Sequence, residues 1–427
     1  MNAAIIFILL AVLMLTGMPI SISLGLTVLT FLFGFTNVPL ESVALKLFTG
    51  IEKFEIMAIP FFILAGNFLT HGGVARRMIN FASSMVGHWC GGLGLAGVLA
   101  CALFAAVSGS SPATVVAIGS ILLPAMVKAG FPSKFGAGVI TTSGALGILI
   151  PPSIVMVMYS VATNTSVGAL FMAGVVPGIA LAMTLGGVTY YRARKFNYPR
   201  LPKASWTQRL KAFKESAWGL LLIVIVMGGI YAGIFTPTEA AAMSAVYAFV
   251  VAVFVYKDMG LKDVPRVLLN SANMAAMLLY IITNAVLFSF IMTNENIPQA
   301  LADWMLGNGL GMITFLLACN VILLLAGNFM EPSSIVLIFA PILFPVAMKL
   351  GIDPVHFGII MVVNMEVGMC HPPVGLNLYV ASGITKMGIT ELTVAVWPWL
   401  LAMLGFLGVV TYWPGLSLWF PRMLGMM

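Results

Sequence analysis

Long apolar runs, two of them interrupted by polar residues at their centres, constrain this chain more than any other feature. Of the 427 residues, 61% are hydrophobic and 8% are charged. A soluble domain carries about 25% charged residues, and a membrane span needs roughly 20 apolar ones. The composition therefore predicts an all-α polytopic membrane protein. The expected spans lie near 3–18, 20–36, 57–72, 137–161, 168–190, 218–236, 239–257, 271–292, 356–381 and 393–420.

The basic residues predict the orientation of these spans. Eight of the 20 Lys and Arg residues lie between Arg192 and Lys214, and such a cluster beside a span marks the cytoplasmic side. With the loop 191–216 in the cytoplasm, both termini fall on the outer side of the membrane, and nothing favours binding of nucleic acid. The first run has neither a basic start nor a small-residue cleavage site, so we expect a retained span rather than a signal peptide.

Two further apolar regions, 92–128 and 313–349, are each broken at the centre by small and polar residues. The first break reads SGSSPAT (108–114), and its counterpart reads AGNFMEPSS (326–334). In lipid an unsatisfied backbone group costs several kcal/mol, so such a break must be paired, wet or buried in protein. We therefore expect two re-entrant helical hairpins in preference to two pairs of full spans.

A shift of 221 residues partly overlays the chain on itself. The six identities, over about 30 residues, are Pro124 with Pro345, Lys128 with Lys349, Gly130 with Gly351, Gly147 with Gly368, and Pro151-Pro152 with Pro372-Pro373. The orientation above makes the two Pro-Pro spans run in opposite directions. Inverted repeats with matched broken helices are typical of alternating-access transporters, whose binding site lies at the breaks.

The hairpin tip and the Pro-Pro break supply oxygen ligands at the same predicted depth. Ser108, Ser110 and Ser111 offer hydroxyls, and a Pro-Pro pair frees carbonyls around residues 147–150. These groups suit Na⁺, and half-helix N-termini suit an anionic carboxylate. The structural alternative is that Ser and Gly merely allow close helix packing. Because both the polar tip and the Pro-Pro pair occur twice in the chain, we favour a role in ligand binding over a role in packing alone.

Several polar side chains within apolar runs are further candidates. An ionisable group at membrane depth is a functional hypothesis by default, which applies to Glu331 and to Glu366. Glu239 is expected instead to cap a helix after Thr236 or Thr238. His371 is more simply a structural donor at the helix break than a proton carrier. Neutral amides near the second break come from Asn328, Asn364 and Asn377.

Enzyme motifs are missing from the sequence. It has no Gly-Lys-Ser/Thr phosphate loop, no His-Glu-x-x-His pair and no Gly-x-Ser-x-Gly elbow. We therefore expect a secondary transporter that uses no ATP. The four cysteines lack metal-ligand spacing, so no transition metal is expected, and they are predicted to be buried.

With these residues in hand, the chain resembles the large membrane subunit of TRAP (tripartite ATP-independent periplasmic) transporters, the DctM family, along essentially its whole length. The resemblance is carried by IPFFILAGNFLTHGGVARRMINFA (59–82), SGSSPATVVAIGS (108–120), GILIPPSIVMVMY (147–159), GIFTPTEAAA (233–242), AGNFMEPSSI (326–335) and HPPVGLNLYV (371–380).

The resemblance implies an elevator-type transporter in a bacterial inner membrane, driven by Na⁺. It implies two partners, a small four-helix membrane subunit (DctQ-like) and a periplasmic substrate-binding protein (DctP-like) that delivers an organic anion, besides the surrounding lipid. It also implies a division of the chain into scaffold and moving parts. The units are 1–90 (scaffold and arm), 91–165 (first hairpin and broken helix), 166–217 (connecting helix and basic loop), 218–310 (second scaffold), 311–385 (second hairpin and broken helix) and 386–427 (C-terminal helix).

The resemblance and the tip chemistry together name the candidate site residues. The first sodium site comprises Ser108, Ser110, Gly147, Ile150 and Pro152. The second comprises Gly327, Gly368, His371 and Pro373. The substrate site comprises Ser110, Ser111, Asn328, Glu331 and Asn364.

The sequence leaves more than one alternative open for the substrate and for the mode of transport. The segment NFMEPSS looks like C4-dicarboxylate members, which implies succinate, malate or fumarate. Some sialic-acid members have Asp at the position of Glu331, so sialic acid or another carboxylic acid is the alternative. A stand-alone Na⁺/anion carrier and an ion channel built from re-entrant loops are the alternatives to a permease that depends on a binding protein.

Overall fold

A computed structural model describes residues 2–36 and 38–426, and the described part is helical without a β-strand. Eight of its helices are long and apolar enough to cross a membrane by length and composition. The prediction of an all-α polytopic membrane protein is therefore confirmed. The four cysteines are free and buried, as expected.

The first half of the chain begins with helices that frame the molecule. They are α1 (Asn2–Leu15), α2 (Ile20–Phe35), α3 (Leu40–Thr49), η1 (Phe54–Met57), α4 (Ala58–His71) and α5 (Val74–Val86). A hairpin, a broken helix and a long helix follow. They are α6 (Gly92–Ser108), α7 (Ser111–Lys128), α8 (Ser133–Gly144), η2 (Ala145–Ile148), α9 (Ile154–Thr163) and α10 (Val167–Lys195).

The second half repeats this order after the basic loop. Its framing helices are α11 (Trp206–Ile223), η3 (Val224–Gly228), α12 (Gly229–Tyr231), α13 (Pro237–Val250), η4 (Val251–Val255), α14 (Val264–Asn294) and α15 (Ile297–Gly307). The hairpin, broken helix and final helices are α16 (Met312–Gly327), α17 (Pro332–Lys349), α18 (Pro354–Met369), α19 (Leu376–Thr385), α20 (Ile389–Tyr412) and α21 (Gly415–Met423).

The shift of 221 residues extends far beyond the six identities. It carries the bounds of α7 onto those of α17 and places α6, α8, α9 and α10 within a few residues of α16, α18, α19 and α20. One difference is structural. The first half divides its framing segment into α3 and α4, whereas the second half uses the continuous 31-residue α14.

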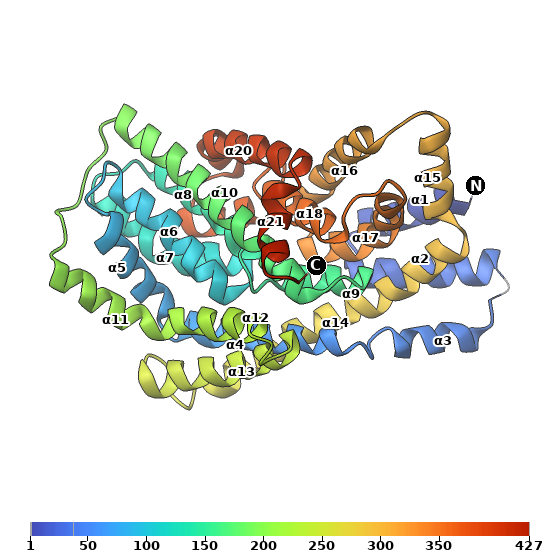
Figure 1. The fold of residues 1–427 in the computed structure, drawn as a ribbon, viewed down its shortest axis with the longest axis horizontal. Coiled ribbons are helices and arrows are strands. Elements are labelled where there is room, and N and C mark those ends of the chain that lie inside the picture. Colours follow the sequence, from blue (N-terminus) through green and yellow to red (C-terminus); the bar gives the residue numbers. More distant parts are fainter. Residues whose placement is uncertain (1, 37, 427) are drawn as a thin grey trace.

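The two hairpins enter the molecule from opposite ends. The pair α6 and α7 lies on the same side as the loop between α10 and α11, and the pair α16 and α17 lies on the other side (Figure 1). Each hairpin packs against its own broken helix, and the two halves also interlock because α9 packs on α17 and α19 packs on α7. This opposed entry is the arrangement that inverted repeats produce.

Both Pro-Pro segments interrupt their helices completely rather than kinking them. The expected span 137–161 is divided into α8 and η2, an irregular segment, and α9, while 356–381 is divided into α18 and α19. Both Pro-Pro peptide bonds, Pro151-Pro152 and Pro372-Pro373, are cis. Because two consecutive prolines remove two N–H donors, neither helix regains its hydrogen-bond ladder until Ile154 or Leu376.

Two of the expected span boundaries were wrong. The last span ends at Tyr412 rather than 420, because Pro414 follows and α21 begins as a separate helix. The span expected at 218–236 begins at Trp206, where Ser205 and Gln208 form a capping box. Its first turns are charged, so hydropathy alone did not include them. Glu239 completes the expected cap with Thr236, whose hydroxyl accepts from the Glu239 amide at 3.3 Å.

Buried polar side chains join the long helices of the two halves. Trp399 of α20 is fully buried, and its indole N–H donates to Thr189 Oγ1 of α10 at 2.9 Å. Asn364 of α18 donates to Asn320 Oδ1 of α16 at 2.7 Å, and Asn320 donates to Thr411 Oγ1 of α20 at 3.0 Å. Such paired amides and hydroxyls hold helices together where no water can solvate them.

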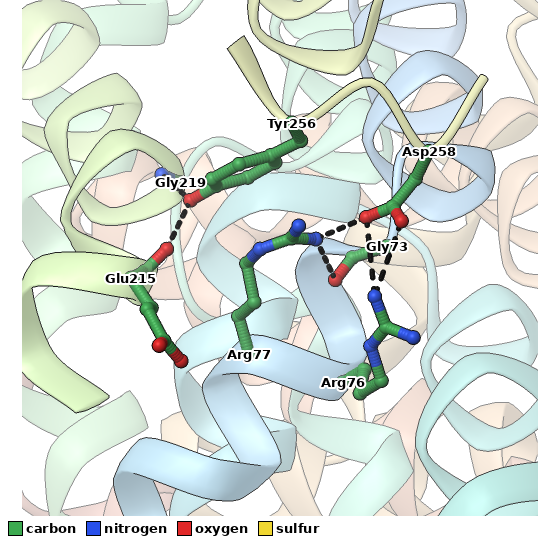
Figure 2. Close-up of polar contacts among 7 residues, drawn as sticks. All are labelled: Gly73, Arg76, Arg77, Glu215, Gly219, Tyr256 and Asp258. Carbon is green, nitrogen blue, oxygen red and sulfur yellow. Dashed lines mark hydrogen bonds and ion pairs between the residues drawn. The ribbon is translucent and has the colours of Figure 1, made fainter. Parts of the chain in front are cut away.

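An ionic cluster ties α5 to the segment after η4. Asp258 pairs with Arg76 at 3.1 Å and closely with Arg77. The Arg77 guanidinium stacks 3.7 Å from the centre of the Tyr256 ring. The Tyr256 hydroxyl donates to the Glu215 carbonyl of α11 at 2.7 Å (Figure 2). The cluster therefore links α5, through the segment after η4, to α11.

We predict that Asp258→Asn destabilises the protein by about 1–2 kcal/mol, because it leaves two arginines without their partner in a partly buried site. Thermal unfolding of the purified protein in detergent should show a fall of a few degrees. The matched control is Asp303→Asn, which breaks the Lys349 pair at a site where the two side chains are 73% and 42% exposed. It should stay within about 0.5 kcal/mol of wild type, and equal shifts for the two variants would contradict the prediction.

Candidate functional site

The first hairpin turns through two residues. Gly109 ends α6 in the left-handed region with a φ of 61°, and Ser110 precedes α7 in an extended conformation. The Ser108 hydroxyl lies 3.0 Å from the Thr114 hydroxyl, and Thr114 donates to the Ser110 carbonyl at 2.8 Å. The predicted tip is thus a compact group of hydroxyls and carbonyls.

This tip rests directly on the first broken helix. Ser111 Oγ donates to the Ala145 carbonyl at 2.8 Å. A Cβ atom on Gly147 would lie 2.6 Å from the Ser110 carbonyl, and one on Gly109 would lie 2.9 Å from the Pro152 carbonyl. The two glycines therefore allow the backbone of the tip to contact the backbone of the broken helix, with no side chain between them.

The second tip meets its broken helix through a similar contact. Gly327 and Gly368 face each other so closely that a Cβ on either would lie 2.9 Å from the other's Cα. The Asn328 carbonyl accepts from the Gly375 amide at 3.1 Å, and its side-chain oxygen lies 2.9 Å from His371 Nδ1. His371 is thus held at the helix break.

A cavity of about 480 Å³ separates the tips from the framing helices. Small-molecule sites are commonly 300–1,000 Å³. The first tip contributes Ser108 through Ala113, and the second contributes Glu331, Pro332 and Ser333. On the opposite wall are Ile63, Gly66, Asn67 and Thr70 of α4 and Met274, Met277 and Leu278 of α14.

Four helices begin at this cavity. The first residue of each helix lines the cavity, namely Ser111 of α7, Ile154 of α9, Pro332 of α17 and Leu376 of α19. The first amides of a helix have no intrahelical acceptor, and the helix dipole places partial positive charge at this end. The four N-termini therefore make the cavity favourable for an anion.

Electrostatically, the cavity is notable for the lack of a cationic side chain in the described part of its lining. Among the described residues that line it there is no Lys, Arg or His, and Glu331 is the acid. The Glu331 carboxylate accepts from the Ser333 hydroxyl at 2.6 Å. A carboxylate beside an anion requires a compensating positive charge nearby, so this arrangement suits an anion that enters together with cations.

The candidate residues separate into three groups. Ser108, Ser110, Ser111 and Glu331 line the cavity. Around them, the glycines and Asn328 form the contacts between tips and breaks described above, and Ile150 packs against Gly178 of α10. Asn364 lies outside the cavity in the chain to Asn320, and Pro373 is exposed. Glu366 and Asn377 are fully buried outside the cavity lining.

The sequence reasoning missed the framing wall of the cavity. Asn67 donates to Ser271 Oγ at 2.8 Å, which joins α4 to α14, and a Cβ on Gly66 would lie 3.1 Å from the Ser108 carbonyl. A signal was available, because the tetrapeptide AGNF occurs at 65–68 and again at 326–329. In both copies the glycine contacts a hairpin tip or a broken helix.

A lysine connects the framing part to the first broken helix outside the cavity. Lys53, before η1, donates to the Val161 carbonyl at 2.6 Å and to Asn164 Oδ1 at 2.7 Å. Burial lowers the pKa of Lys53, and the neighbouring Glu55 opposes this effect. The two parts that face each other across the cavity are therefore also joined by side-chain hydrogen bonds.

Paired hairpins and broken helices that end at one cavity define a membrane transporter, not an enzyme. Residues 7–416 match the family model "Tripartite ATP-independent periplasmic transporter, DctM component". The chain belongs to this family.

Individual relatives agree with this assignment, and a solved structure has a similar fold. The chain is 77% identical to the C4-dicarboxylate TRAP transporter large permease protein DctM of Rhodobacter capsulatus, with 100% of both chains covered. It is 55% identical to the protein of the same name from Pseudomonas aeruginosa, with 95% of both covered. The YdaH transporter of Alcanivorax borkumensis has a similar fold, with a TM-score of 0.63, 16% identity, and 88% and 89% of the two chains covered.

We predict that Gly147→Ala destabilises the protein by about 1–3 kcal/mol, because its methyl group would collide with backbone atoms of the hairpin tip. Thermal unfolding measures this loss. The matched control is Gly187→Ala in α10, where a Cβ meets nothing within 4 Å, so stability should be unchanged or higher. An unchanged Gly147→Ala protein would show that the tip does not rest tightly on the break.

Proposed function

We propose that this chain is the large permease subunit of a Na⁺-driven secondary transporter that imports C4-dicarboxylates such as succinate, malate or fumarate. The single observation that carries the proposal is the cavity between the hairpin tips and the framing helices, where four helix N-termini meet and no described lining residue is cationic. The substrate class is supported by the full-length relative of 77% identity that bears this name.

Sodium ions are the proposed source of the missing positive charge. Hydroxyl and carbonyl oxygens gather at the first tip around Ser108, Ser110 and Gly147, and hard cations prefer such oxygens. The segment from Ile150 to Pro152 adds freed carbonyls. At the second tip, Gly327, Gly368, His371 and Pro373 remain the proposed surroundings of a second ion. The bound ions would offset both the substrate carboxylates and Glu331.

Transport is proposed to proceed by an elevator movement. The hairpins and broken helices would carry the anion past α4 and α14, which face them across the cavity. The Lys53 link to Val161 and Asn164 would break in each cycle. A moving part made of 91–165 and 311–385 agrees with this scheme.

The proposed assembly contains two partners. Membership of the family implies a small membrane subunit and a periplasmic substrate-binding protein. We propose a four-helix DctQ-like subunit beside the framing helices and a DctP-like protein that delivers the anion on the side opposite the basic loop. The proposed location is the bacterial inner membrane, with both termini periplasmic.

Uptake of radiolabelled succinate into proteoliposomes tests the proposal. The vesicles contain this chain and its small subunit, with or without the binding protein, under an imposed Na⁺ gradient. We expect uptake only when both the gradient and the binding protein are present. Uptake that needs neither would favour a stand-alone carrier or channel, and activity with sialic acid in place of succinate would correct the substrate alone.

Glu331→Gln tests the role of the carboxylate in the cavity. We expect succinate uptake to fall by at least about tenfold, because a hydrogen bond or ion contact to a charged group contributes about 1.5–3 kcal/mol. Glu239→Gln is the matched control, since Glu239 is an exposed capping residue and glutamine also completes a capping box. Equal activity of the two variants would exclude Glu331 from the transport site.

A further inference from the structure

A second pocket lies among the framing helices and shares no lining residue with the cavity at the hairpin tips. It has a volume of about 530 Å³ and is lined by residues of α5, α11 and the end of η4. Arg77, Glu215 and Tyr256, which form part of the ionic cluster in Figure 2, belong to its wall. The remaining lining residues are Thr207, Leu210, Lys211, Lys214, Trp218 and Val255.

Some charged groups of this pocket are paired with other residues, and others are not. Arg77 donates to the Gly73 carbonyl at 3.0 Å and pairs with Asp258, so its position is fixed. Lys211 and Lys214 are exposed and take part in no ion pair among the described residues. They lie three residues apart on α11, which brings their ammonium groups to one face. The pocket wall therefore carries two unpaired ammonium groups, Lys211 and Lys214, against one carboxylate, Glu215, so an excess of positive charge is left beside the fixed Arg77.

The pocket also has an apolar wall at the level where α11 enters the membrane. The helix changes from charged residues to a continuous apolar sequence after Glu215. Trp218 at this level is 45% exposed, and tryptophan prefers the membrane–water interface. Leu210 and Val255 extend the wall, and Leu221 of α11 and Val224 of η3 continue an exposed apolar surface.

We propose that this pocket binds the headgroup phosphate of an anionic phospholipid, held by Lys211 and Lys214, with an acyl chain along the apolar side of α11. Basic pockets between membrane helices on the cytoplasmic side bind such headgroups. A free phosphate would use the lysines but not the apolar wall. The lipid would brace α5, α11 and η4 at the point where Arg77 joins them.

Lipid binding to the full-length protein tests this proposal without reference to transport. The purified protein in detergent is titrated with phosphatidylglycerol, with phosphatidylcholine, and with inorganic phosphate, while native mass spectrometry counts bound lipid and thermal unfolding records stabilisation. The test variant is Lys211→Gln/Lys214→Gln. The control variant is Arg200→Gln/Lys203→Gln, which removes the same charge from the same basic segment outside the pocket.

We expect wild type and the control variant to bind phosphatidylglycerol about thirtyfold more tightly than the test variant, from the attraction of two lysines for an anionic headgroup. Lys211→Arg/Lys214→Arg should keep the binding, which separates lost charge from lost folding. Equal loss in the control, equal binding of phosphatidylcholine, or equal stabilisation by inorganic phosphate would overturn the proposal. So would loss of the effect when the small membrane subunit is present, because the pocket would then belong to a subunit interface.

Discussion

Backbone amides that lipid cannot hydrate determine the architecture of this protein. A helix that ends inside a membrane exposes several unpaired N–H or C=O groups, and each must find a partner within the protein. Here the ends of hairpins and broken helices meet one another. Glycines at 109, 147, 327 and 368 bring these backbones into contact. The cavity exists because the same helix ends that need partners also surround a common space.

Much of this arrangement could be predicted from local sequence. Proline pairs and polar tips inside apolar runs have strong local effects, so both hairpins and both helix breaks were predicted at the correct places. The charged first turns of α11 were missed because hydropathy does not detect a polar helix. The wall from α4 and α14 was missed because contacts such as Asn67 with Ser271 join residues about 200 positions apart. Asn364, a substrate candidate from its depth, instead bonds to Asn320, a partner that no local pattern indicates.

The two halves share a plan but differ in chemistry at equivalent positions. The shift of 221 residues places Ser110, which precedes α7, on Glu331, which precedes α17. One tip therefore offers a hydroxyl and the other a carboxylate to the same cavity. The framing parts differ as well, because α3 and α4 are separate whereas α14 is continuous. A duplicated unit has thus acquired two tips with different electrostatics.

None of the described residues that line the cavity is cationic, and this affects how quickly a bound anion could leave. A lysine or arginine buried beside a carboxylate would form a strong charge-assisted pair, and breaking it would leave an unsolvated charge behind. Amides at helix ends carry only partial positive charge, so losing the anion costs them less than it would cost a full buried charge. A site built in this way binds the anion less tightly and releases it faster. Fast release suits a transporter, which must release each substrate molecule that it binds.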